Sequence, residues 1–287
     1  MGLFTYNLNL ISDIPINLGL TVRSGQLFHW IETAENTFRI IIRRTVIKAY
    51  QINDNTIDVE VMGEALDKEQ LKAIFGLSFD RRQLMTRLKK DNLLHNLIPA
   101  YRGLTIMKQD PYECLISFMA SAVSNIPRIM QNLHNLRWET GSPIAGSNEK
   151  ALPNSEDIVR IGETRLRQIG LGYRSRFIYL TCKKLVEEHI ALPLWTKKSD
   201  DELLASLTHF PGVGRKIAEC AMLFGYSRLS AFPVDVWVRR ALARLRPPLT
   251  KMSPVDLCEW GRNRWGEAAG LAQQILFCAA RDGKIPD

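Results

Sequence analysis

Lys216 is the residue whose type and position could best perform covalent chemistry. It stands two residues after Gly214, in the first turn of a helix that the sequence predicts from about residue 214. The dipole of that helix, partial burial and the neighbouring Arg215 all disfavour a protonated amine, so we expect Lys216 to lose its proton readily. A neutral amine is a nucleophile that can form a Schiff base with a sugar carbon. The plainer interpretation is a surface lysine that holds a phosphate.

Asp235 is the second candidate, 19 residues after Lys216. It follows Pro233 and Val234 and precedes an apolar helix, which is the position of an N-cap. The separation suffices for one helix and a return loop, so we expect the two side chains to face one cleft. A carboxylate there would stabilise a cationic transition state at a sugar and assist proton transfer. The alternative is a residue that only caps the helix; we expect Asp235 to do both.

Two glycines precede Lys216 in the segment 210–214, Phe-Pro-Gly-Val-Gly. Placed between two helical patterns, Gly212 and Gly214 predict a tight hairpin between helices. Its backbone N–H groups would point outward at the start of the second helix and form a nest for a phosphate. An ordinary helix–helix turn is the alternative, and Lys216 and Asp235 argue against it.

The elements that must position these residues fall into two parts. The first part is β-rich: residues 7–10, 17–22 and 57–61 alternate between polar and apolar, and 38–52 is rich in β-branched residues. Helices are expected at 68–75 and 80–95. From residue 110 the apolar period becomes helical, with Asp110 as a cap before Pro111. The expected helices of this part are 126–138, 155–161, 163–168, 173–188, 200–207, 214–223, 235–244, 253–265 and 267–282.

The sequence therefore predicts an α+β fold of two domains. Residues 1–107 form a small α+β domain and residues 108–287 a larger all-α domain. The segment 141–154 is polar, and we expect a surface loop without an assigned role.

The positive charge is concentrated in the second part. The chain has 38 Lys and Arg against 30 Asp and Glu, a net charge of +8. Residues 215–246 hold seven basic residues against Glu219 and Asp235, which favours a polyanionic partner. No apolar run approaches the roughly 20 residues of a membrane span. Five cysteines without a C-x-x-C pair indicate neither a disulfide framework, a zinc site nor an iron–sulfur cluster, and they favour a reduced, intracellular location.

These motifs resemble the helix-hairpin-helix, Gly/Pro-Asp (HhH-GPD) superfamily of DNA glycosylases. The hairpin, Lys216 and Asp235 match its motif, and a lysine at 216 is what the bifunctional members carry. Further blocks, in the same order and over nearly the whole chain, are similar to 8-oxoguanine DNA glycosylases: 24–30, 109–115, 125–129, 171–176 and 272–277. The resemblance implies an N-terminal antiparallel β-sheet domain that recognises the lesion, followed by a helical catalytic domain.

The resemblance also implies the chemistry and the base pocket. Such enzymes turn the damaged nucleotide out of the duplex; Lys216 would attack C1′ and expel the base, and elimination would nick the strand. Asp235 would stabilise the developing positive charge. The carbonyl of Gly25 would accept the N7–H of 8-oxoguanine, Gln273 would read the pairing edge, and Phe277 and Cys220 would cover the two faces. By spacing alone, Phe277 and Cys220 would be packing residues and Gln273 a solvent-facing one.

Contacts to DNA are implied by the same resemblance. Tyr173 would wedge into the base stack, and Arg128 and Arg174 would fill the gap or contact the unpaired base. Without the resemblance, Tyr173 and the pair Arg174 and Arg176 would be interpreted as a loop with solvated charges. The hairpin backbone at Gly212, Val213 and Gly214 would hold the 3′-side phosphate. Carbonyls of Thr208, Phe210 and Val213 would hold a monovalent cation, and no other cofactor is expected.

Two positions depart from the family's pattern. In the opposite-base region Val123-Ser124-Asn125, valine stands where cytosine-reading members have asparagine. Valine cannot hydrogen-bond to cytosine, so strict preference for that partner is not expected. Trp237 stands where the family has a phosphate-contacting histidine, which puts the local phosphate geometry in doubt.

Three functions follow from these observations. The first is a monomeric enzyme that excises 8-oxoguanine from double-stranded DNA and nicks the abasic site, in the cytoplasm or nucleoid, or in the nucleus of a eukaryote. The second is an alkylated-base (3-methyladenine type) glycosylase of the same superfamily, which Lys216 speaks against and the several tryptophans favour. The third is a non-enzymatic DNA-binding protein that uses the hairpin alone, which Asp235 and the pocket residues argue against.

Overall fold

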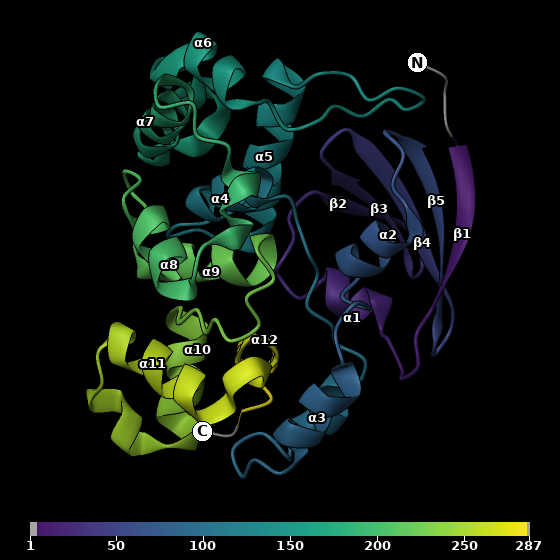
Figure 1. The fold of residues 1–287 in the computed structure, drawn as a ribbon, viewed down its shortest axis with the longest axis vertical. Coiled ribbons are helices and arrows are strands. Elements are labelled where there is room, and N and C mark those ends of the chain that lie inside the picture. Colours follow the sequence, from purple (N-terminus) through teal and green to yellow (C-terminus); the bar gives the residue numbers. More distant parts are fainter. Residues whose placement is uncertain (1–4, 286–287) are drawn as a thin grey trace.

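The computed structural model describes residues 5–285, and its N-terminal part is a five-stranded antiparallel sheet (Figure 1). The strand order is β1-β5-β4-β3-β2. The strands are β1 (Thr5–Ile11), β2 (Trp30–Ala34), β3 (Thr37–Ile42), β4 (Thr45–Asn53) and β5 (Thr56–Gly63). Two helices, α1 (Leu18–Val22) and α2 (Lys68–Ile74), contribute to the core on one face of this sheet.

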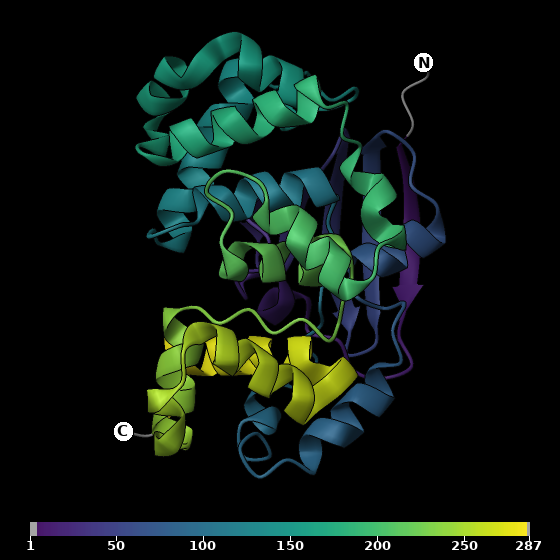
Figure 2. The same ribbon diagram turned by 60° about the vertical axis from the view of Figure 1, so that its left-hand side comes forward.

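The remaining helices form three tiers beside the sheet (Figure 2). One tier holds α5, α6 and α7, the middle tier α4, α8 and α9, and the last α10, α11 and α12 together with α3. Their bounds are α3 (Arg81–Lys89), α4 (Pro111–Ala120), α5 (Ile126–Thr140), α6 (Ser155–Leu166), α7 (Arg174–Glu187), α8 (Asp200–Thr208), α9 (Arg215–Cys220), α10 (Val236–Leu245), α11 (Pro254–Trp265) and α12 (Ala269–Arg281).

The expected α+β class and its N-terminal antiparallel sheet are confirmed, but three local expectations were wrong. Residues 17–22 form α1 instead of a strand, because the Asn17 side chain accepts the N–H of Leu20 (2.8 Å) and caps a helix. Strand β2 was missed because it is an exposed edge strand without an apolar alternation. The helix expected over 80–95 ends at Lys89.

The segment 141–154, expected from its polar sequence to be a surface loop without an assigned role, packs against the sheet. Pro143 and Lys150 form a β-bridge, and Ile144, 1% exposed, packs against Ile41 and Val46 of the sheet. An ion pair between Glu149 Oε1 and Arg39 Nε (3.2 Å) adds a second tie. The segment therefore links the helical part to the sheet, as the strand-like extension beside β5 in Figure 1 shows.

Two large hydrophobic clusters underlie this arrangement. One cluster joins the sheet to helices α1 and α2, and the other forms the core of the helical part. Residues of α3 and of the segment 94–106 belong to the helical cluster, although they precede the boundary expected at residue 107. The boundary itself stays a prediction.

A buried carboxylate, that of Glu219, joins three segments of the helical part. Glu219 is 0% exposed; its Oε1 accepts Arg215 Nε (2.9 Å), and its Oε2 accepts the N–H of Phe232 (3.1 Å). Arg262 Nη2 of α11 lies 3.5 Å from Oε2. Helix α9, the segment before Asp235 and helix α11 are therefore held at fixed relative positions.

We expect Glu219→Ala to lower the free energy of unfolding by about 3–5 kcal/mol, because two arginines and a backbone N–H would lose their buried partner. Urea unfolding monitored by circular dichroism measures this. Glu69→Ala is the matched control: its carboxylate is exposed, pairs with Lys72 (2.8 Å), and should change stability by less than about 1 kcal/mol. Equal effects of the two substitutions would contradict the role given to Glu219.

Candidate active site

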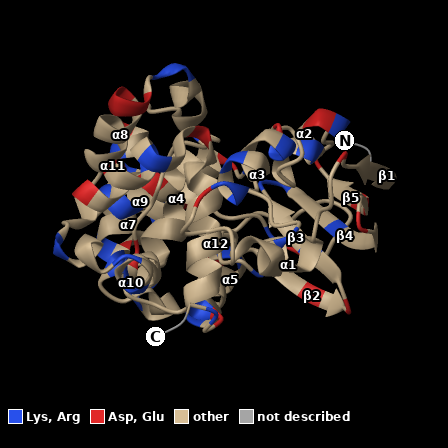
Figure 3. Ribbon diagram, turned by 90° about the horizontal axis from the view of Figure 1, so that it is seen from below, with Lys and Arg blue, Asp and Glu red and all other residues tan. Residues whose placement is uncertain are grey.

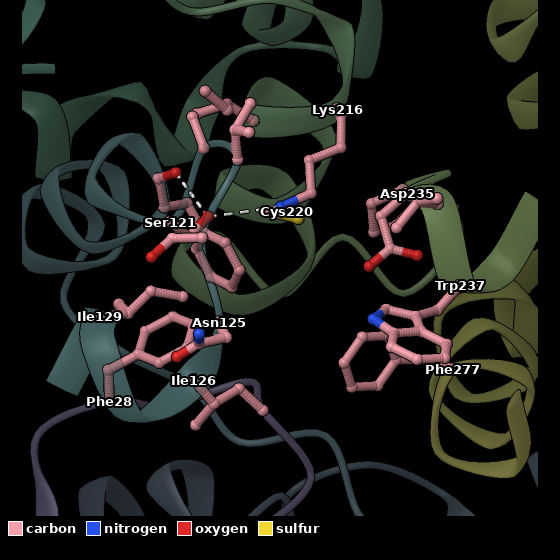
Figure 4. Close-up of a pocket in the computed structure, with 18 of the residues that line it drawn as sticks. Phe28, Ser121, Asn125, Ile126, Ile129, Lys216, Cys220, Asp235, Trp237 and Phe277 are labelled. Carbon is pink, nitrogen blue, oxygen red and sulfur yellow. Dashed lines mark hydrogen bonds between the residues drawn. The ribbon is translucent and has the colours of Figure 1, made fainter. Parts of the chain in front are cut away.

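A cavity of about 910 Å³ opens mainly among helices of the second part, and Gly25 and Phe28 of the first part complete its wall (Figure 4). Its walls are mainly apolar, and segments far apart in the chain contribute to it. The lining residues that carry the argument below are Gly25, Val123, Lys216, Cys220, Asp235, Trp237, Gln273, Gln274 and Phe277. The structure therefore places both proposed catalytic residues and all four proposed base-pocket residues around one space.

Lys216 reaches this cavity from the first turn of α9. Gly214 is the N-cap of that helix and supplies no side chain, so the entrance beside Lys216 is open. The amine donates to Ser121 Oγ (3.5 Å) and lies 5.1 Å from the centre of the Phe118 ring. Among residues 5–285, no carboxylate forms an ion pair with Lys216, so its amine is available to a ligand.

Asp235 enters the same cavity from the segment that precedes α10. Its Oδ1 accepts the N–H of Val238 (2.8 Å), which confirms that Asp235 is the N-cap. Burial raises the pKa of this carboxyl, opposed by the Val238 N–H and by the charge of Lys216. The other oxygen can face the cavity, so capping and chemistry are compatible in one side chain (Figure 4).

At the side of the cavity where the base pocket is expected, the backbone of Gly25 lies close to the Phe277 ring. Gly25 has φ of +79°, and a Cβ there would lie 3.1 Å from the Phe277 ring and 3.0 Å from Ile126. Any larger residue would crowd the Phe277 ring and strain the backbone at this φ. Across the cavity, burial raises the pKa of the Cys220 thiol to about 12, so this side chain is neutral and apolar in character.

The hairpin between α8 and α9 has the geometry that its glycines predict. Gly212 has φ of +76°, and a Cβ there would collide with the ring of Phe177. Gly212 and Gly214 are exposed and Val213 is buried, so backbone is the part that faces outward.

The cation expected in this hairpin would have only carbonyl oxygens as ligands. The Phe210 carbonyl already accepts the Val213 N–H (3.1 Å) and keeps one lone pair. Within residues 5–285 no group of three His, Cys, Asp or Glu side chains could hold a metal ion. Neutral carbonyls suit a monovalent cation, and the site with Thr208, Phe210 and Val213 stays a prediction.

The loop that follows α4 is held in a strained conformation by Arg174. Val123 is 91% exposed and has φ of +49°, which is rare for a β-branched residue. Arg174 donates through Nε to the Ala122 carbonyl (2.5 Å) and through Nη2 to the Val123 carbonyl (2.7 Å). The Tyr173 hydroxyl donates to the Ala122 carbonyl as well (3.3 Å). Arg174 is 8% exposed, so the structure shows a loop clamp where we expected a contact to the unpaired base; that contact stays a prediction.

The other expected DNA-contacting residues lie around the same mouth. Asn125 caps α5 by accepting the Arg128 N–H (3.0 Å), and Arg128 itself is exposed. Ser124 is half-buried, and no described partner bonds to its hydroxyl. Trp237 lines the cavity, with the Arg240 guanidinium 5.5 Å from its ring centre.

Sequence reasoning missed two residues of the site, Phe118 and Ser121, which lie against the Lys216 amine. Phe118 carried only the helical spacing of a core residue, and Ser121 carried no pattern. Their place at the end of α4, directly before the exposed loop, was the available signal.

The charge distribution matches a polyanionic ligand at this side of the molecule. Helix α10 carries three arginines and no acidic residue, and it begins at Asp235 (Figure 3). Among residues 5–285, every helix is too short or too polar to cross a lipid bilayer.

Comparison with known proteins shows the same two parts. Residues 10–115 match the model of the 8-oxoguanine DNA glycosylase N-terminal domain, and residues 118–259 match that of the HhH-GPD superfamily of base excision DNA repair proteins.

Three similar proteins cover nearly the whole chain. A probable N-glycosylase/DNA lyase of Methanothermobacter thermautotrophicus is 31% identical over 96% of this chain and 97% of its own length. The Clostridium acetobutylicum 8-oxoguanine glycosylase/lyase, solved with double-stranded DNA containing cytosine opposite 8-oxoguanine, is 27% identical, with a TM-score of 0.85 over 97% of this chain and 99% of its own. A 3-methyladenine DNA glycosylase of Archaeoglobus fulgidus, 21% identical with a TM-score of 0.79 over 96% and 98% of the two chains, shares the fold. The chain therefore belongs to the 8-oxoguanine DNA glycosylase family of the HhH-GPD superfamily.

Proposed function

We propose that this protein excises 8-oxoguanine from double-stranded DNA and then cuts the strand at the abasic site. The observation that carries the proposal is one cavity lined by a lysine amine that forms no ion pair among residues 5–285, a largely buried carboxylate, and an apolar wall that includes Gly25 and Phe277. The matched families act in base excision repair, and relatives of the whole chain are named N-glycosylase/DNA lyases. The enzyme would act as a monomer on intracellular DNA.

Lys216 performs the covalent step in this proposal. After it gives up a proton, the amine attacks C1′ of the extruded nucleotide while the C1′–N9 bond breaks, and the base leaves with the electron pair and takes up a proton. Opening of the sugar ring gives an imine between Nζ and C1′. Loss of a proton from C2′ then breaks the C3′–O bond, which nicks the strand.

Asp235 stabilises the positive charge that develops on the sugar during that step. A carboxylate in an apolar cavity interacts strongly with a nearby cation, since little water screens it. Its second task, capping α10, holds it at a fixed place in the cavity wall. The base itself is read by the Gly25 carbonyl and by Gln273, with Phe277 and Cys220 on its faces.

The DNA around the lesion contacts the mouth of the cavity. Tyr173 and Val123 are exposed at this mouth, and in this proposal they would enter the space that the extruded nucleotide leaves. The backbone of 212–214 binds a phosphate on the 3′ side, and the cation of the same hairpin would add positive charge there.

Borohydride trapping tests the covalent step. Wild-type protein and a duplex with 8-oxoguanine should give a covalent adduct, and Lys216→Gln should give none and lower strand cutting by more than about a thousandfold. Lys89→Gln, an exposed lysine of α3, removes the same charge elsewhere and should behave as wild type.

Three outcomes of that assay contradict the proposal. Equal cutting by Lys216→Gln would exclude the lysine as nucleophile. Release of an alkylated base without nicking would favour the alkyl-base glycosylase. Affinity for DNA without any chemistry would favour a binding protein.

The pH dependence of excision tests Asp235. Only the ionised carboxylate can stabilise a cation, and burial raises its pKa, so the rate should fall on acidification at a pH above the titration range of an ordinary aspartate. Asp235→Asn keeps the N-cap, because asparagine caps as well as aspartate does. This variant should be slower and should lose the acidic limb in single-turnover rates measured against pH. The same limb in both proteins would rule out Asp235 as its source.

The choice of opposite base tests Val123. We expect single-turnover excision rates opposite cytosine, adenine, guanine and thymine to agree within about tenfold, since valine offers no hydrogen bond to any base. Val123→Asn should raise the preference for cytosine, and asparagine also tolerates the positive φ. Val255→Asn, at an exposed position of α11, should leave the preference unchanged. A hundredfold preference of the wild type for cytosine would disprove the expectation.

A further inference from the structure

A second glutamine, Gln274, lines the cavity beside Gln273. Gln273 is 5% exposed and Gln274 is 2% exposed. Among the described residues, Oε1 of each amide is buried without a hydrogen-bond partner. Buried polar side chains are usually paired, because an unpaired amide loses its hydration without compensation. Two such amides on one cavity wall therefore point to a ligand that supplies the missing partners.

The spacing of the two glutamines relative to Phe277 shows where that ligand would lie. On a helix, side chains three and four residues apart are neighbours. Gln274 precedes Phe277 by three residues and Gln273 precedes it by four, all within α12. Both amides therefore lie about one helical turn before the Phe277 ring, on the same side of α12 as that ring. A flat ligand against Phe277 would present its edge to both.

The cavity wall is mainly apolar, although Ser121, Ser124, Asn125, Trp237 and Arg281 also line it. Phe28, Ile126 and Ile217 are apolar, and the Cys220 thiol is neutral. Hydrogen bonds inside so apolar a space discriminate strongly between ligands, since a wrong group leaves a buried donor or acceptor unpaired. Two amides bring four donor hydrogens and two acceptor oxygens to the edge of the ligand.

We propose that Gln274 is a specificity-determining residue that hydrogen-bonds to the extruded base together with Gln273. The ligand class is a purine whose edge carries both donor and acceptor groups, as an oxidised guanine does. This inference rests on the function proposed above and adds a residue to its base recognition.

The test compares two substrates of the full-length protein. A duplex with 8-oxoguanine needs base recognition, whereas a duplex with a preformed abasic site has no base to recognise. Gln274→Leu keeps the side-chain volume, and Gln274→Ala removes it. For both variants we expect excision of 8-oxoguanine to fall by about tenfold or more, the loss typical of a buried hydrogen bond, and abasic-site cutting to stay within twofold of wild type. Gln83→Ala, at an exposed position of α3, should leave both activities unchanged.

Each other outcome overturns the inference. Excision at the wild-type rate by both variants would show that Gln274 makes no bond to the base. An equal loss on both substrates would show a structural role. If the wild type cuts abasic sites but leaves 8-oxoguanine in place, the proposed substrate is wrong, and that failure is visible before any variant is made.

Discussion

The buried carboxylate of Glu219 is the interaction on which the geometry of the site depends. Lys216 and Asp235 belong to different segments, and neither segment determines the position of the other. Glu219 lies one turn after Lys216 on α9, and it accepts the N–H of Phe232, three residues before Asp235. Arg215 and Arg262 compensate its charge in the core. One side chain therefore sets the distance between the nucleophile and the carboxylate.

The apolar cavity has opposite effects on the carboxylate that it contains. Burial raises the pKa of Asp235, which disfavours its charged form. The same low polarity strengthens its attraction to a cation that forms on the sugar. The N–H of Val238 resolves this conflict, because it stabilises the charged form while leaving one oxygen to the cavity. Capping is in this way a condition for the chemistry.

Local signals in the sequence predicted the site better than they predicted the periphery of the fold. The glycine hairpin and the capping position of Asp235 depend on neighbours in the chain, so the shared cavity of Lys216 and Asp235 could be inferred from their spacing. Helix α1 has a local cap at Asn17 that its alternating sequence concealed, and edge strand β2 has no apolar alternation. The contacts of 141–154 depend on distant partners, such as the packing of Ile144 on the sheet. The clamp made by Arg174 likewise depends on distant partners, since the Ala122 and Val123 carbonyls lie some fifty residues earlier in the chain.

The Arg174 clamp changes how the opposite-base region should be understood. A left-handed conformation at a β-branched residue costs about 1–3 kcal/mol and persists only where its surroundings hold it. Two hydrogen bonds from Arg174 to the Ala122 and Val123 carbonyls provide that restraint before any DNA is bound. An ordered loop loses little conformational entropy on binding. Because its Nε and one terminal nitrogen are engaged in this way, Arg174 restrains the loop that carries the exposed Val123, in addition to any contact that it makes with an unpaired base.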